Sequence, residues 1–140
     1  MDFYMTAEKE IADLIDSFYK IISGSKDQPR DWELFRALFV QDARLLPLKA
    51  LPEGIVSRSF TVEEYINRLQ SFLRVNDFYE FGENYRIEIV NHLAHACTEY
   101  RAKNNLNGNT PLKQGVNLIH FINDGKRWLI SFMQWEDTTQ

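Results

Sequence analysis

The sequence lacks the features of a membrane-spanning protein or of one from an oxidising compartment. Its single cysteine, Cys97, cannot form an intramolecular disulfide, and the opening residues MDFYMTAEKEIAD contain no basic segment followed by an apolar one. No apolar run approaches the ~18–20 residues that a membrane-spanning helix requires, because even LFRALFV is interrupted by Arg36. We therefore expect a soluble, cytoplasmic protein with no membrane partner.

The sequence also lacks an excess of basic residues. It has 16 Lys and Arg against 20 Asp and Glu, which gives a net charge of −4. Nucleic acids are bound by clustered basic surfaces, whereas the basic residues here are scattered along the chain. Nucleic acid is therefore not an expected partner unless folding gathers four arginines onto one face, namely Arg58, Arg68, Arg74 and Arg86.

Aromatic residues, by contrast, are abundant, with 10 Phe, 6 Tyr and 3 Trp. Disordered chains have few aromatic residues and low hydrophobicity, whereas 44% of this chain is apolar, so we expect a compact core. A length of 140 residues suits one domain, and no repeat, low-complexity tract or linker divides the sequence. We expect a single domain over residues 1–140.

Apolar residues at helical spacing predict three helices in the first half of the chain. The first is expected over residues 6–23, with Gly24 as its stop, and the second over 29–40. The third is expected over 61–75, because Thr61 and Glu64 form a capping box before a periodic apolar run.

The second half has the composition of strands, rich in Ile, Val, Thr and Tyr. We predict a strand at 78–81, a turn at 82–84, and then a long strand-rich run and two strands, at 85–103, 114–123 and 127–135. The loop 104–113 and the Asp124-Gly125 turn connect them as hairpins. Earlier in the chain, Pro47 and Pro52 restrict the prediction to a short strand at 43–47 followed by a loop. Helices segregated from antiparallel strands indicate an α+β domain.

Two segments resemble the nuclear transport factor 2-like superfamily, which includes SnoaL-like polyketide cyclases, ketosteroid isomerase and scytalone dehydratase. They are residues 38–43, LFVQDA, and the ending GVNLIHFINDGKRWLISFMQW, and the resemblance spans about Ala7 to Glu136. It implies three N-terminal helices packed on a strongly curved, mostly antiparallel sheet that forms a cone. It also implies an internal pocket for a small apolar or polycyclic molecule, and a homodimer through the outer sheet face.

The catalytic groups of these relatives are not all matched in this chain. Ketosteroid isomerase uses a tyrosine, a carboxylate base and a protonated aspartate, and the matching positions here hold Phe18, Pro47 and Asn117. Asn117 can donate a hydrogen bond but cannot titrate, so steroid-isomerase chemistry is not expected. The dehydratase uses paired histidines, an aspartate and an asparagine. Asn117 stands at the asparagine position, but neither His92 nor His95 aligns with the histidines.

Strand alternation, combined with the resemblance, predicts a polar trio inside the pocket: His95, Asn117 and Gln134. The same reasoning, which assumes that the last strand has no bulge, gives the trio three aromatic walls: Phe18, Phe121 and Phe132. Two further groups are expected at the pocket, Tyr19 from the first helix and Glu80 near the mouth of the cone.

These candidates also have simpler interpretations. Asn117 would suit a core amide bonded to a neighbouring strand, Tyr19 a solvent-facing phenol, and Glu80 an exposed charge at a strand end. A metal site is not expected, because His92 and His95 point to opposite faces of a strand and one cysteine cannot form a structural zinc pattern.

The function that this pattern favours is a small-molecule pocket protein. As an enzyme it would be a cyclase, isomerase or dehydratase without a cofactor, with His95 as proton carrier and Asn117 orienting a carbonyl or hydroxyl. The alternative is a non-catalytic ligand-binding or homodimerisation module, because the strand 114–123 is apolar on both faces. Its His120 face, together with Met133 and Trp135, is expected to meet a second subunit.

Overall fold

The computed structural model describes residues 3–108 and 111–138, so part of the predicted loop at 104–113 lies outside the described residues. The described chain forms three helices: α1 (Phe3–Ile22), α2 (Trp32–Arg36) and α3 (Val62–Leu73). Its strands are β1 (Phe39–Leu51), β2 (Gly54–Ser57), β3 (Phe60–Thr61), β4 (Tyr79–Val90), β5 (Leu93–Lys103), β6 (Lys113–Asn123) and β7 (Trp128–Asp137). This confirms the α+β class. The resemblance implied three N-terminal helices, but α3 follows β1, β2 and β3, where the sequence pattern had predicted only one short strand at 43–47 before it.

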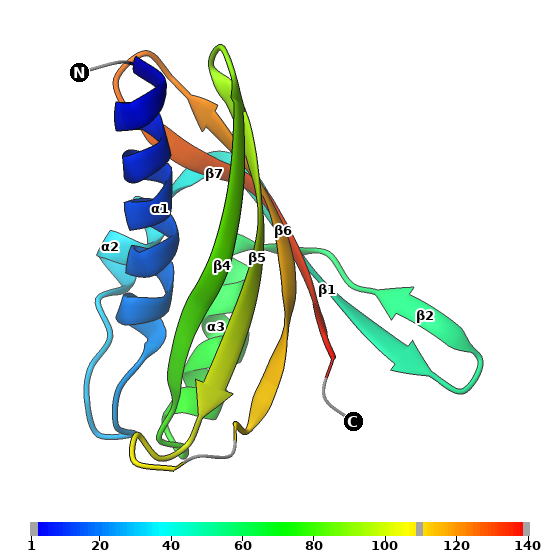
Figure 1. Cartoon of the computed structure of the whole chain (residues 1–140). Coiled ribbons are helices and arrows are strands. Elements are labelled where there is room, and N and C mark those ends of the chain that lie inside the picture. Colours follow the sequence, from blue (N-terminus) through cyan, green and yellow to red (C-terminus); the bar gives the residue numbers. More distant parts are fainter. Residues whose placement is uncertain (1–2, 109–110, 139–140) are drawn as a thin grey trace.

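The strands form one curved, unclosed sheet in the order β2-β1-β7-β6-β5-β4, with β3 paired to β1. Helix α1 packs along β4, and α3 packs against β1 and β3 on the same side of the sheet (Figure 1). We call the side that faces the helices the inner face and the opposite side the outer face. The hairpin of β1 and β2 extends away from this body (Figure 1).

Helix α1 forms because its apolar residues recur at helical spacing and cover one stripe. Ile11, Ile15 and Ile22 on that stripe are fully buried against the sheet. The helix begins at Phe3, about a turn before the expected start at Thr6. It ends before Gly24, whose φ of 150° only glycine adopts easily, and Gly24 then bridges to Phe78 through hydrogen bonds of 2.7 and 3.0 Å.

The second helix is shorter than predicted, because the residues that would extend it are used in the sheet. Asp31 caps α2 by accepting a hydrogen bond from the Leu34 N–H at 3.0 Å. The Leu38 carbonyl then accepts from the Ile130 N–H at 2.8 Å, and Phe39 pairs with Ile130 in β7. The residues predicted to form the apolar stripe of this helix do pack into the core, but those after α2 belong to a turn and to β1.

Strand β1 also runs straight through Pro47, where a short strand and a loop were predicted. β1 pairs with β7 on one side, and on the other side with β3 at Arg44 and Leu45 and with β2 from Leu48 onward. Pro47 lies in the gap between these two partners, where only its carbonyl is used, accepting from Arg58 N–H at 3.4 Å. A missing N–H costs no ladder bond at such a position.

Helix α3 follows its sequence prediction closely. The Glu64 N–H donates to Thr61 Oγ1 at 3.1 Å, and the Thr61 N–H donates to Glu64 Oε1 at 2.9 Å, so the predicted capping box is present. Val62, Ile66 and Leu73 bury the apolar stripe. The helix ends at Leu73, two residues before the predicted end.

The strand boundaries of the second half differ from the prediction at one turn. The expected turn at 82–84 is a bulge inside β4, where the pairing register shifts between Glu83 and Arg86 and Asn84 has a φ of 55°. The chain instead turns at Asn91, with a φ of 57°, and His92. The run 85–103 is thus the end of β4, a tight turn and β5.

Strand β7 contains a second bulge, which decides which of its residues face the helices. His120 pairs with Phe132 and Phe121 pairs with Ile130, so Ser131 has no partner across the ladder. Beyond this residue the faces exchange relative to regular alternation. Met133, Trp135 and Asp137 consequently join the inner face, and Phe132 and Gln134 join the outer face.

Candidate functional site

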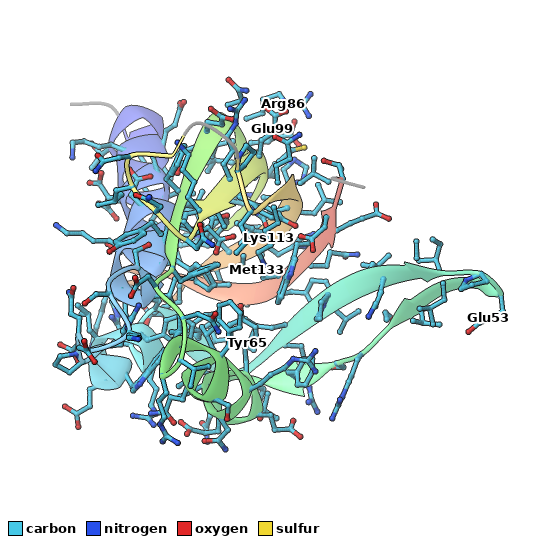
Figure 2. The ribbon with its side chains drawn as sticks, turned by 90° about the horizontal axis from the view of Figure 1, so that it is seen from below. Glu53, Tyr65, Arg86, Glu99, Lys113 and Met133 are labelled. Atoms are coloured by element: carbon cyan, nitrogen blue, oxygen red, sulfur yellow. The ribbon has the colours of Figure 1, made fainter. Side chains whose placement is uncertain are left out.

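A cavity of about 680 Å³ lies at the end of the inner face where α3 and β1 meet the ends of β6 and β7. Much of its wall is aromatic or aliphatic, including Phe60, Tyr65, Leu69, Phe72, Phe78 and Trp135. Tyr65 and Trp135 meet edge to face with ring centroids 5.5 Å apart. Figure 2 shows Tyr65 on α3 and Lys113 on β6 bordering this end of the molecule, far from Glu53 at the hairpin tip. The volume lies within the ~300–1,000 Å³ typical of small-molecule sites.

Glu80 places a carboxyl group on the inner face, where it lines a smaller cavity and interacts electrostatically with Lys113 and Asp137 of the larger one. It pairs with Ala102 of β5, and the next pair on the same face joins Gly82 to Tyr100. The Glu80 backbone is fixed to α1 by Ser23, whose hydroxyl donates to its carbonyl at 3.1 Å and accepts from its N–H at 2.9 Å. Burial raises the pKa of the Glu80 carboxyl to about 7; Lys113 acts against this shift and Asp137 adds to it.

Tyr100 and Asp137 lie beside Glu80 and are held by a short hydrogen bond. The Tyr100 hydroxyl donates to Asp137 Oδ1 at 2.5 Å. Gly115 makes this possible, because a Cβ at that position would overlap the Tyr100 hydroxyl and the Glu136 carbonyl oxygen. Lys113 Nζ lies 5.8 Å from the centre of the Tyr100 ring and 5.7 Å from that of Phe78, which places a cation over two aromatic rings.

A buried hydrogen-bonded cluster of Asn117, Tyr19 and Thr98, different from the predicted polar trio, links α1 to the middle of the sheet. Asn117 Nδ2 donates to the hydroxyls of Tyr19 and of Thr98, the latter at 3.0 Å, and all three side chains are buried. Burial and the charge of Glu80 raise the pKa of Tyr19, so its phenol is neutral at pH 7 and retains a proton to donate. Asn117 is therefore the bonded core amide of the simpler interpretation, while Tyr19 also lines a smaller cavity that Glu80 shares.

The predicted site residues separate into three groups. Tyr19, Asn117 and Glu80 lie on the inner side, but none of them lines the larger cavity; Tyr19 and Glu80 line the smaller one. Phe18 and Phe121 are buried in the core and do not line the larger cavity, since Phe18 packs against Tyr19, Phe35 and Phe39. The placement of His95, Phe132 and Gln134 in the pocket is wrong, because strand register and the β7 bulge put all three on the outer face.

On the outer face, His95 belongs to a surface cluster. Its Nε2 lies 3.3 Å from Glu88 Oε1, and its ring centroid lies 6.2 Å from that of His120, which in turn contacts Phe132 at 5.9 Å. The His95 side chain is 55% exposed, so it cannot carry protons inside the cavity. Among the described residues, no three His, Cys, Asp or Glu side chains are grouped as metal ligands would be.

Searches of protein-family models and of curated proteins give no match to this sequence. Solved structures do match over nearly the whole chain. A protein of unknown function with a cystatin-like fold from Nostoc punctiforme is 17% identical, with a TM-score of 0.75 over 100% of this chain and 97% of its own. An NTF2-like protein with a cystatin-like fold from Novosphingobium aromaticivorans is 14% identical, with a TM-score of 0.74 over 96% and 84%. The protein has the NTF2-like, cystatin-like fold.

This fold is the one that the sequence resemblance implied. A candidate scytalone dehydratase from Novosphingobium aromaticivorans has it too, with 14% identity and a TM-score of 0.69 over 97% of this chain and 87% of its own. At such identities the NTF2-like fold is shared, but the chemistry of one member does not transfer to another.

The cavity also contains groups that the sequence did not point to. Tyr65, Trp135, Lys113 and Asp137 line it, and Tyr100 contacts its polar side. Trp135 was expected on the outer face with Met133, and the β7 bulge brings both inward. One feature of the sequence could have indicated Tyr100. It lies two residues after Thr98 and four after Ala96, so strand alternation puts it on the same face of β5 as these two residues.

Within the described residues, no helix is both long and apolar enough to span a membrane. The four arginines considered for nucleic acid are not gathered on one face either. Arg58 and Arg68 line the larger cavity, Arg74 lines a separate groove beside Trp32, and Arg86 donates to Cys97 on the outer face.

Proposed function

We propose that the protein binds a small molecule with an apolar, aromatic-sized body in the larger cavity, and that Glu80 transfers a proton on it without a cofactor. The cavity would be the internal pocket of the cone that the resemblance implies. The observation that carries the proposal is a buried carboxyl group with a pKa of about 7 on the inner face, within electrostatic reach of Lys113 and Asp137, which line the aromatic cavity. Such a group exists in both protonation states at neutral pH, as a general acid and base must.

The proposed step is a proton transfer next to a carbonyl group. The Glu80 carboxylate accepts a proton from the carbon adjacent to the carbonyl, which leaves an enolate and a neutral carboxylic acid. That acid returns the proton to the same or a neighbouring carbon, as in an isomerase, or to a departing hydroxyl, as in a dehydratase. Lys113, which lines the larger cavity, would stabilise the enolate oxygen, because a charged donor acts strongly where water is excluded.

The test is hydrogen–deuterium exchange of 1-tetralone, an apolar bicyclic ketone with exchangeable protons beside its carbonyl. We expect the wild-type protein to accelerate this exchange with an apparent pKa near 7, and Glu80→Gln to abolish the acceleration while Glu53→Gln, at the hairpin tip, retains it. Displacement of the fluorescent ligand N-phenyl-1-naphthylamine shows whether 1-tetralone is bound. Bound 1-tetralone that exchanges no faster than with Glu80→Gln would refute the proton-transfer proposal.

A second candidate is a homodimer formed through the outer face, either as a binding module alone or alongside catalysis. The supporting observation is the row of apolar side chains on β6: Val116, Leu118 and Ile122 are 38%, 50% and 37% exposed. Large exposed apolar rows are typical of interfaces. We also propose that the protein is cytoplasmic, because its single cysteine, Cys97, forms no disulfide.

A further inference from the structure

The larger cavity has a cationic rim in a chain whose net charge is −4. Among its lining residues are four cations, Lys49, Arg58, Arg68 and Lys113, and a single acid, Asp137. The acid is already engaged by the Tyr100 hydroxyl. The mouth of an otherwise apolar cavity is therefore positive, and its charge is not neutralised by the residues that line it.

Two of these cations contact the same buried aromatic ring. The guanidinium carbons of Arg58 and Arg68 lie 4.8 and 5.2 Å from the centre of the Phe60 ring, which is only 3% exposed. Within the described residues neither guanidinium forms an ion pair or a side-chain hydrogen bond, whereas Arg36 and Arg101 bind Glu63 and Glu83 elsewhere on the surface.

The nearby acids do not occupy these guanidinium groups. Glu64 is close enough for Arg58 to lower its pKa slightly, but its carboxylate accepts from the Thr61 N–H in the capping box, which is the main cause of that lowering. Asp137 accepts a hydrogen bond from the Tyr100 hydroxyl instead. The N–H donors of Arg58 and Arg68 thus remain available at the rim, in the planar geometry that binds oxyanions.

We propose that the ligand of this cavity is an amphipathic organic anion. Its ring system would occupy the aromatic cavity, and one oxyanion group, a carboxylate, sulfonate or phosphate, would bind Arg58 and Arg68 at the rim. This inference rests on the proposed function for the existence of a ligand, and it adds the charge and the orientation of that ligand. The anionic end points outward, so the apolar end lies nearer Glu80 and Tyr65.

The test compares two fluorescent probes that differ by one charged group. These are 8-anilinonaphthalene-1-sulfonate and its uncharged counterpart, N-phenyl-1-naphthylamine. We expect the wild-type protein to bind the sulfonate more tightly, and the double variant Arg58→Gln/Arg68→Gln to bind it about tenfold or more weakly, while the uncharged probe changes less than about twofold. The matched control, Arg74→Gln/Arg86→Gln, removes the same charge outside this cavity and should leave both affinities unchanged.

Competition by 1-naphthoate and by 1-naphthyl phosphate then separates a carboxylate ligand from a phosphate ligand. Salt provides a check that needs no variant, since the sulfonate affinity of the wild-type protein should fall as NaCl rises and the affinity for the uncharged probe should not. Equal loss in the cavity variant and the control, or no preference for the sulfonate, would overturn the inference while leaving the cavity proposal intact. A wild-type protein that binds neither probe would overturn both.

Discussion

Glu80→Gln should make the protein more stable than wild type at alkaline pH and leave it nearly unchanged in acid. The pKa of Glu80 is raised from 4.5 to about 7 in the folded protein. Between these values the folded state holds a proton that the unfolded state has released, so each pH unit lowers the free energy of unfolding by about 1.4 kcal/mol. Glu80 therefore does not reduce the free energy of unfolding below pH 4.5, but it lowers that free energy by about 3 kcal/mol once the pH passes 7.

Glutamine has the shape of the protonated side chain and carries no charge at any pH, so the variant escapes this loss. A difference of about 3 kcal/mol is a large share of the ~5–15 kcal/mol by which domains are stable. Both proteins are unfolded with urea at the same protein concentration from pH 4 to pH 8.5. The quantity to follow is the difference between their free energies of unfolding at each pH. Glu53→Gln, on the exposed hairpin tip, serves as the control for removing one negative charge.

The result that refutes the reasoning is a difference between Glu80→Gln and wild type that stays constant over this pH range. The same refutation follows if Glu53→Gln reproduces the pH dependence, because the effect would then come from net charge. Carbon-detected NMR gives an independent reading, since one carboxyl resonance of the wild-type protein should titrate near pH 7 and be missing in Glu80→Gln.

Three further outcomes are expected. Gly115→Ala should lower the unfolding free energy by about 2 kcal/mol or more, because its Cβ would overlap the Tyr100 ring and the β7 backbone; urea unfolding that matches wild type would contradict this. Asn117→Leu should cost about 2 kcal/mol by the same assay, since it leaves two buried hydroxyls without their donor, and a neutral result would show that the buried cluster is not formed. Leu118→Arg should convert a dimer to a monomer in sedimentation, while Ile55→Arg on β2 should not; a wild-type monomer well above micromolar concentration would refute the interface.

The parts of the fold that the sequence predicted well are those determined by neighbouring residues. Helix α3 is an example, because the capping box of Thr61 and Glu64 and the apolar spacing after it need no distant partner. The end of α2 and the course of β1 are different. Phe39 enters a strand because β7 pairs with it, and Pro47 is tolerated because it lies between two pairing partners. Neither fact is encoded near those residues.

The candidate site was only partly predictable for a related reason. Tyr19 could be named from its position beside the apolar stripe of the first helix, and Glu80 from the family resemblance, which puts it near the mouth of the cone. Their chemistry could not, because the pKa of Glu80 depends on burial and on Lys113 and Asp137, which come from other strands. The basic residues that looked scattered in the sequence included Arg58 and Arg68, which the turn into β3 and the first turns of α3 bring together over Phe60.

The bulge at Ser131 affects both the fold and the candidate site. With regular alternation, β7 would present Phe132 and Gln134 to the cavity, which is the arrangement that the sequence suggested. The extra residue shifts the pairing, so Trp135 closes the aromatic wall against Tyr65 and Asp137 reaches Tyr100. Asp137 in turn adds to the raised pKa of Glu80. One unpaired residue therefore decides both the shape of the cavity and part of the electrostatics of its acid, because a shift of one position moves every later side chain to the other face.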